Sequence, residues 1–327
     1  MEHPLIVAAD PRLFIRATAL IVVALVAHAF RLYGWRRGLR IMLTLLVVAY
    51  LKETTQEGSP YEVSPAIAPG GVPVGIIFGW FIVGMLALEW SRLAALTIRP
   101  ETAGGLMRRV LGMIFFGAAA GNALEPIGQA AGWWRWPGET FPYIAHTIWA
   151  GMVPLLTIPA LLVGSLVSLK FLGRLTVTVL AIAAMFVGSY LIFVVGGISG
   201  LALPGNPTPA ALAVMGVLLP AMAVMMYRSR ALTLHPAMLR PRAAGSMGLA
   251  NAIPSLCTWA IIWVLVRYAL ESPFPGFWIH CIPLAALTLI MDAHWLDRWA
   301  RATARRRKLA LRRIPRVSVA PPVAAAR

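Results

Sequence analysis

The sequence predicts an all-α membrane protein, a bundle of about nine transmembrane helices with the amino terminus outside and the carboxyl terminus in the cytoplasm. Of the 327 residues, 59% are hydrophobic and only 13% are charged, which is more apolar surface than a soluble domain can bury. The apolar segments are long and continuous, and this favours helices over a closed barrel. The loops between them alternate between basic and acidic character, as expected for a multi-pass protein of the bacterial inner membrane.

Nine apolar segments are interpreted as spans, since a helix needs roughly 20 residues to cross the hydrocarbon core. They lie at 13–33, 39–54, 71–96, 107–125, 142–167, 171–195, 208–226, 247–269 and 276–293. The second is short for a crossing, so we expect it to pack inside the bundle or to tilt little. The residues before the first span lack the basic region of a signal peptide, which predicts an uncleaved span. We expect a helical domain over 1–297 and a basic cytoplasmic tail over 298–327, disordered at its end.

The distribution of charge predicts the topology. One set of loops, together with the tail, holds 24 of the 29 Lys and Arg residues, and the positive-inside rule assigns this set to the cytoplasm. The other five are Arg12, Arg16, Lys52, Arg135 and Arg267. Acidic residues have the opposite bias, and those on the predicted outer side are Glu53, Glu57, Glu62, Glu125, Glu139 and Glu271. Termini on opposite sides require an odd number of spans, which nine satisfies.

The formal net charge of +17 comes largely from the tail, which directly follows an apolar segment. Its densest run is Arg305, Arg306, Arg307 and Lys308. We expect this tail to lie on anionic lipid headgroups. A nucleic acid partner is not expected, because no stacking motif interleaves the charges.

The sequence predicts no metal and no cofactor. None of the six histidines forms an HxxxH or HExxH pair, and no P-loop, dinucleotide fingerprint or haem motif occurs. Cys257 and Cys281 each lie inside an apolar segment, where buried free thiols are expected rather than a disulfide or a zinc site. The expected partner is a lipophilic molecule in the bilayer, and a homo-oligomer is left open.

Two carboxylates at the ends of predicted spans are the candidate catalytic groups. Glu53 closes the second span and Glu125 closes the fourth, and removal from water favours the protonated carboxyl group that a general acid needs. Pro126 is expected to end the helix directly after Glu125, and Asn122 could orient the carboxyl group. The alternative is that both glutamates are ordinary interfacial carboxylates, solvated or ion-paired. The basic residues available for such pairs are Lys52, Arg135 and Arg267.

A tryptophan-rich loop follows Glu125. Its Trp133, Trp134 and Trp136 are typical of an interfacial aromatic belt, but they could also form a pocket wall, where aromatic faces stabilise a cation by about 2 kcal/mol or more. The residues that could join such a wall are Tyr61, Trp80, Tyr143, His146 and Trp149. Of these, His146 is more readily explained as a hydrogen-bonded core residue. On the basic side, ordinary ion pairing is expected for Glu89, Asp292 and Asp297.

Three stretches carry a family resemblance: AYLKETTQEGSPYEV followed by GGVPVGIIFGW, then NALEPIGQAAGWWRW, and late in the chain GFWIHCIPLAALTLI. They resemble the membrane-bound carotenoid biosynthesis proteins of the CruF type, the carotenoid 1,2-hydratases. The sequence departs from that family in three ways. Glu125 stands where the family has Asp, the loop after Glu53 is shorter, and GETFPYIAHTIW replaces a Gly-x-Pro and Asn before the next span.

The resemblance implies a membrane-embedded hydratase that adds water to a terminal isoprenoid double bond of a carotenoid by acid catalysis. Glu125 would be the proton donor and Glu53 would position the water, although these roles could be exchanged. Two alternatives stay open, namely a membrane isoprenoid cyclase and a non-enzymatic assembly or transport subunit. A polar pocket holding a water would favour hydration, a dry pocket would favour cyclisation, and the lack of any pocket would favour the subunit.

Overall fold

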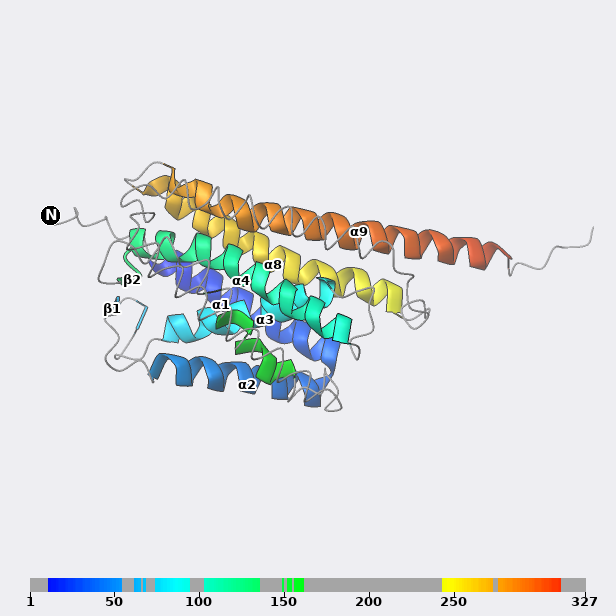
Figure 1. Ribbon diagram of the computed structural model, residues 1–327, viewed down its shortest axis with the longest axis horizontal. Coiled ribbons are helices and arrows are strands. Elements are labelled where there is room, and N and C mark those ends of the chain that lie inside the picture. Colours follow the sequence, from blue (N-terminus) through cyan, green and yellow to red (C-terminus); the bar gives the residue numbers. More distant parts are fainter. Residues whose placement is uncertain are drawn as a thin grey trace, which may run out of the picture.

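The computed structural model describes residues 11–54, 62–65, 67–68, 74–94, 103–135, 149, 152–154, 156–161, 243–272 and 276–312. Apart from one two-residue strand pairing and short turns, these residues are helical (Figure 1). The elements discussed below are α1 (Pro11–Tyr33), α2 (Trp35–Thr54), β1 (Glu62–Val63), α3 (Val74–Ala94), α4 (Ala103–Ala130), β2 (Trp134–Arg135), α8 (Ala243–Glu271), η4 (Phe277–His280) and α9 (Cys281–Arg312). The predicted all-α class is confirmed.

Five helices in the described part of the chain are long and apolar enough to cross a membrane. They are Leu13–Tyr33, Val74–Leu93, Arg109–Ala130, Ala252–Glu271 and Phe277–Ala310. They match the first, third, fourth, eighth and ninth predicted spans, and α2 forms a helix at the second. The spans predicted at 171–195 and 208–226, and most of the span at 142–167, lie outside the described residues. The count of nine and the orientation of the termini therefore stay predictions.

Helix α3 occupies the centre of the bundle, where it packs against α1, α2 and α4. Residues 80–91 of this helix are buried without interruption. A helix that is apolar on all sides is expected to be enclosed by other helices rather than by lipid or water. Helix α1 also contacts α8, α8 pairs with α9, and α9 in turn contacts α4.

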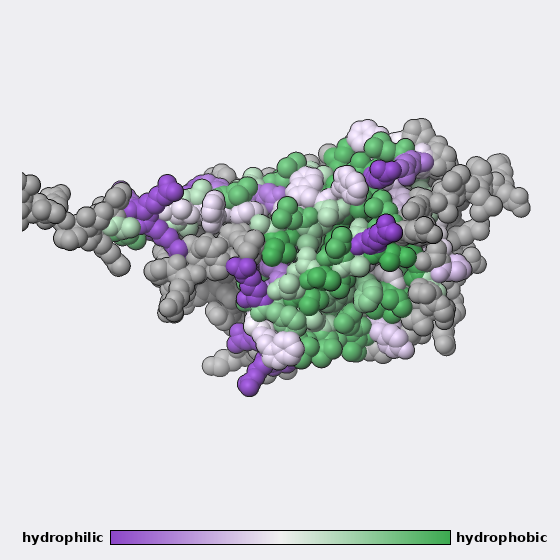
Figure 2. All heavy atoms as spheres, turned by 180° about the vertical axis from the view of Figure 1, so that it is seen from behind, coloured by the Kyte–Doolittle hydropathy of each residue, from purple (hydrophilic) through white to green (hydrophobic). Residues whose placement is uncertain are grey.

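The outer surface of the bundle carries large apolar side chains. Leu20 of α1 is 72% exposed, and Leu256 and Leu270 of α8 are 66% and 69% exposed. Figure 2 shows a broad apolar area across the middle of one face, with few hydrophilic side chains within it. An exposed apolar surface of this extent is suited to contact with lipid.

The structure corrects the prediction for the end of α4. Pro126 does not end this helix, which continues through it to Ala130. A proline inside a helix removes one backbone hydrogen bond, but the turn that follows is held by packing, since Ile127 is only 1% exposed and Ala130 and Ala131 are 6% exposed.

Helix α9 also runs further than the span predicted at 276–293. It crosses the expected domain boundary after Asp297 without a break and ends at Arg312, and in Figure 1 it extends beyond the other labelled helices. The last part of the predicted tail, 313–327, lies outside the described residues.

Candidate functional site

A cavity of about 170 Å³ lies among four helices and the turn that follows α4. Its wall is formed by the first turns of α1 and α3, the last turns of α4, part of α8, and the segment that contains Trp149. Five aromatic residues line it, namely Phe14, Trp80, Trp133, Trp134 and Trp149. The polar side chains in the wall, apart from the indoles, are those of Thr18 and Glu125.

Glu125 is fixed in this wall by two indole groups. Its side chain is buried, with 6% exposure. The Nε1 atom of Trp134 donates a hydrogen bond to Oε2 at 2.9 Å, and the Nε1 atom of Trp149 donates to Oε1 at 2.9 Å. Hydrogen bonds to an ionised acceptor are stronger than those to a neutral one, so both indoles stabilise this group most when it is a carboxylate.

The turn after α4 explains how Trp134 reaches back to Glu125. Gly132 has a φ of +68°, and the amide of Trp133 donates to the carbonyl of Gly128 at 2.9 Å while the amide of Gly132 donates to Gln129 at 3.0 Å. This pair of bonds is a Schellman motif, which ends a helix and reverses the chain. The ring of Trp134 then lies against Gly128, where a Cβ atom would come within 2.2 Å of it.

A short strand pairing joins the two loops that the sequence singled out. In the antiparallel pair of β1 and β2, Glu62 is opposite Arg135 and Val63 is opposite Trp134. The amide of Ser64 also donates to the carbonyl of Trp133 at 2.9 Å. The loop that follows Glu53 therefore packs against the loop that follows Glu125.

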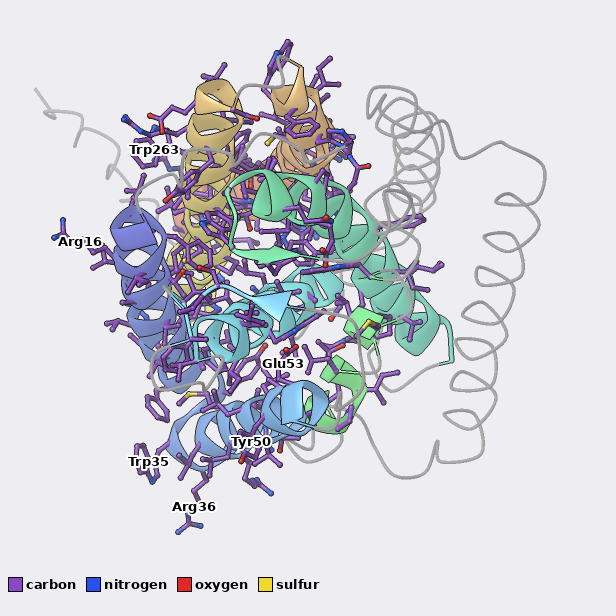
Figure 3. All side chains as sticks on the ribbon, turned by 90° about the vertical axis from the view of Figure 1, so that its left-hand side faces the viewer. Arg16, Trp35, Arg36, Tyr50, Glu53 and Trp263 are labelled. Atoms are coloured by element: carbon purple, nitrogen blue, oxygen red, sulfur yellow. The ribbon has the colours of Figure 1, made fainter. Side chains whose placement is uncertain are left out.

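Glu53 is connected to the cavity through Trp80. The Nε1 atom of Trp80 donates to Oε1 of Glu53 at 2.7 Å, and the Trp80 ring stacks on Trp149 with centroids 4.6 Å apart. Figure 3 shows Glu53 on the side of α2 that faces α3, whereas Tyr50 lies on the outer side. Glu53 itself is not among the residues that line the cavity.

Trp133 is the most enclosed of the tryptophans in the wall, with 2% exposure. The centroid of its ring lies 4.2 Å from the centroid of the Phe14 ring and 4.8 Å from that of Tyr268, which it meets edge to face. Its Nε1 atom is buried and has no hydrogen-bond partner. Buried donors are nearly always satisfied by protein, water or ligand, so this indole is an exception among the residues that the structure describes.

The structure brings together most of the predicted site residues that it describes. Five of them line the cavity, namely Trp80, Glu125, Trp133, Trp134 and Trp149. A sixth, Glu53, reaches it through its hydrogen bond with Trp80. Asn122 instead donates to the carbonyl of His280 at 3.2 Å and does not line the cavity. The remaining predicted residues, Tyr61, Trp136, Tyr143 and His146, lie outside the described residues.

Sequence reasoning missed two parts of the wall. One is the stripe on α1 at positions 14, 17, 18 and 21, and the other is the stripe on α8 at 261, 264 and 265. The spacing of each stripe is that of one face of a helix, which could have indicated an inward face. Nothing in the spacing identifies which loop that face meets.

The ion pairs expected for Glu89 and Asp297 are present, Glu89 with Arg92 at 2.7 Å and Asp297 with Arg301 at 2.7 Å, although Glu89 is fully buried and not interfacial. Arg267, considered as a partner for Glu53 or Glu125, pairs instead with Glu271 at 2.9 Å. Asp292 accepts hydrogen bonds from Ser255, Trp259 and Trp295. Both cysteines are free and buried, as predicted. Within the described residues, no three His, Cys, Asp or Glu side chains are grouped so that they could hold a metal ion.

The arrangement can support one kind of chemistry in particular. A carboxyl group is held by two indoles inside a wall of aromatic rings. Such a wall excludes water from most of the cavity and presents π faces to any positive charge that forms there. Comparisons of the chain with protein-family models, with curated proteins and with solved structures gave no match.

Proposed function

We propose that the protein is a membrane-embedded enzyme that protonates a terminal isoprenoid double bond of a carotenoid or related chain and adds water to the resulting cation. The observation that carries the proposal is the position of Glu125, a buried carboxyl group at an aromatic cavity with both oxygens held by indole N–H groups. The proposed site has no requirement for a nucleotide, since the chemistry involves only proton transfer and addition.

The proton transfer is the difficult step. The Glu125 carboxyl proton goes to the less substituted alkene carbon, the π electrons form the new C–H bond, and a tertiary cation remains. As the proton leaves, negative charge develops on the carboxyl oxygens that Trp134 and Trp149 already contact at 2.9 Å. Donors aimed at developing charge lower the barrier because they need no reorganisation during the reaction.

The cation then needs stabilisation and a nucleophile. The faces of the rings that line the cavity stabilise the positive charge. A water held by the Thr18 hydroxyl, which lines the cavity, is the expected nucleophile. Its oxygen lone pair forms the C–O bond, and the proton that it releases returns to the Glu125 carboxylate, so the acid is regenerated.

The size of the cavity is consistent with a substrate that enters by its end only. Sites that enclose a drug-sized ligand are roughly 300–1,000 Å³ in volume, and this cavity is about 170 Å³. A terminal isoprene unit would occupy it, and the rest of the chain would extend toward the lipid.

A second candidate is cyclisation, in which a carbon–carbon double bond captures the same cation and the new cation loses a proton to the Glu125 carboxylate, which regenerates the acid and an alkene. It is favoured by the wall itself, in which most side chains are apolar and few groups can hold water. Both candidates share the Glu125 proton and the tryptophan wall, and they differ in the atom that captures the cation.

The test is turnover of a linear carotene such as lycopene by purified protein in detergent, in ¹⁸O-labelled water with a chelator present. Label in a new hydroxyl supports hydration, and an unlabelled isomer of the substrate supports cyclisation. Glu125→Gln should reduce the rate by about 10²–10⁴-fold, as expected for loss of a general acid. Glu271→Gln is the matched control, because Glu271 is half exposed and pairs with Arg267 on the surface.

The tryptophan wall is tested in the same assay. Trp134→Phe should cost less activity than Trp134→Ala, because a phenyl ring retains part of the cation stabilisation. Wild-type rates from the Glu125→Gln protein would overturn the acid assignment. No turnover of any isoprenoid by the folded wild-type protein would favour a structural or transport role.

A further inference from the structure

A second cluster of polar residues lies inside the helices at the end opposite the cavity. It comprises His28 and Tyr33 near the end of α1, Glu89 and Arg92 near the end of α3, and Arg109 near the start of α4. The cavity is formed by the other ends of the same three helices. The cluster therefore cannot contact a ligand in the cavity, and its role is separate from the proposed function.

Glu89 is fully satisfied within this cluster. It has 0% exposure, and the Tyr33 hydroxyl donates to its Oε1 atom. The Nε atom of Arg92 donates a hydrogen bond to Oε2 of Glu89 at 2.8 Å, and the Nη2 atom of Arg92 lies 2.7 Å from the same oxygen. The Nε2 atom of His28 lies 3.2 Å from Oε2. The charge of Glu89 is thus offset by Arg92.

Arg109 is different, because it brings a second positive charge that no side chain in the described part of the chain neutralises. It is 9% exposed, and its Nε atom is buried without a hydrogen-bond partner. Among the described residues it has neither an ion pair nor a side-chain hydrogen bond. Glu89 is close enough to interact with it electrostatically, but so is Arg92, which repels it.

A guanidinium that is nine-tenths buried and unpaired is costly, because the ion loses its hydration when it leaves water. Such groups are normally paired with an anion or with hydrogen-bond acceptors. With two arginines and one glutamate, the cluster carries a surplus positive charge. The planar fork of an arginine matches the oxygen geometry of phosphate groups, to which it donates two parallel hydrogen bonds.

We propose that Arg109, beside Arg92, binds a phosphate-type anion at this end of the bundle. The surrounding sequence would concentrate anions there, because Arg31, Arg36, Arg37 and Arg40 lie at the adjoining ends of α1 and α2. Tyr33 near the end of α1 contacts Glu89 near the end of α3, so these two ends lie together, and lipid phosphates lie near them if the helices cross the bilayer. The shared chemistry fits the phosphate of an anionic lipid or free phosphate.

The experiment measures thermal unfolding of the full-length protein in phosphatidylcholine nanodiscs. Phosphatidylglycerol is titrated into the discs in one arm, and inorganic phosphate is added in the other. The unfolding midpoint of the wild-type protein should rise in at least one arm. The arm in which it rises shows whether the bound phosphate group belongs to a lipid or is free phosphate. Arg109→Gln should weaken the apparent affinity by roughly tenfold to hundredfold, the effect of losing a hydrogen-bonded charge.

Arg16→Gln is the matched control, since Arg16 is exposed at the opposite end of the bundle and points outward in Figure 3. It should respond as the wild type does. If Arg109→Gln does not fold, Arg109→Lys keeps the charge but loses the fork, and its affinity should still fall. No response of the wild type in either arm would overturn the proposal, as would a response of the folded Arg109 variants equal to that of the wild type.

Discussion

At the scale of single residues, tryptophan is the recurring partner of buried or half-buried carboxylates. Trp80 donates to Glu53, two tryptophans donate to Glu125, and another two donate to Asp292. An indole provides a hydrogen-bond donor on a large apolar body and adds no charge. In a bundle that faces lipid, it can satisfy a carboxylate without the desolvation cost of a second buried ion.

The contact of Trp149 with Glu125 can be tested by a double-mutant cycle. Trp149→Phe removes the N–H donor but retains an aromatic ring, so the free energy of unfolding should fall by about 0.5–1.5 kcal/mol, as for a hydrogen bond to a neutral carboxyl group. In a Glu125→Ala background, which has no acceptor, the same change should cost less, with a coupling energy of about 0.5 kcal/mol or more. Unfolding in mixed micelles measures both. Equal costs in the two backgrounds would contradict the contact between Trp149 and Glu125. Trp90→Phe is the control, because the Trp90 ring stacks on Phe116.

Gly128 provides a second test, because the indole ring of Trp134 occupies the space of a side chain there. A Cβ atom would lie within 2.2 to 2.6 Å of three ring atoms. Gly128→Ala should therefore displace the ring and lower the free energy of unfolding by about 1–3 kcal/mol, as overpacking does.

Thermal unfolding and tryptophan fluorescence would record the effect of Gly128→Ala. Gly79→Ala is the matched control on α3, since a Cβ atom there meets nothing within 4 Å. If both alanine variants unfold at the same temperature, the Trp134 ring does not lie against Gly128.

At the scale of elements, the end of α4 shows how far sequence reasoning reaches. The Glu125 carboxyl group and the tryptophans after it could be identified from their place at the end of an apolar segment. The sequence predicts that the helix ends at Pro126, whereas in the structure it is ended by Gly132, which has a positive φ. A proline can be accommodated where packing holds the next turn, and packing is a tertiary property that a single sequence does not display.

The contributions of α1 and α8 to the cavity could not be predicted for a related reason. Periodicity identifies which side chains of a helix face inward. It does not identify the partner, and the contact between Phe14 and Trp133 joins residues far apart in the chain. The link from Glu53 to the cavity through Trp80 and Trp149 likewise depends on how three helices pack.

The strand pairing of β1 with β2 predicts a specific sensitivity. Ser64→Pro removes the amide that donates to the Trp133 carbonyl at 2.9 Å, and a proline is compatible with the extended backbone of the preceding residue. Loss of one backbone hydrogen bond costs about 0.5–1.5 kcal/mol, so amides of 133–135 should exchange roughly two- to tenfold faster. Hydrogen exchange with mass spectrometry would detect this. The Ser64→Ala control keeps the amide, so its amides at 133–135 should exchange at the wild-type rate. If the Ser64→Pro variant also exchanges at the wild-type rate, the hydrogen bond from Ser64 to Trp133 does not stabilise this region.

At the scale of the whole molecule, composition and hydropathy were enough for the all-helical class and for the helices that the structure describes. The central position of α3 follows from the apolar character of all its sides. Orientation depends on the basic residues of the loops and tail, and it remains a prediction of the positive-inside rule.

Reporter fusions test that orientation directly. A fusion after Arg316 should be active only with a reporter that works in the cytoplasm, because the basic loops and tail favour that side. A fusion after Glu271, at the end of α8, should be active only with a periplasmic reporter. The reverse pattern would invert the topology and place the cavity end of the bundle on the cytoplasmic side.

The continuity of α9 has a geometric consequence. Its 32 residues form one helix, which Asp292 fixes against α8 through Ser255 and Trp259. An α-helix turns about 100° per residue, so the direction in which Arg301 and the arginines after it face is set by their residue distance from Asp292. An insertion of a single residue between them would leave the composition of the charged end almost unchanged and yet swing its arginines by about 100° around the axis. The number of residues between Asp292 and these arginines therefore determines the direction in which their charge faces, in addition to how much charge the helix end carries.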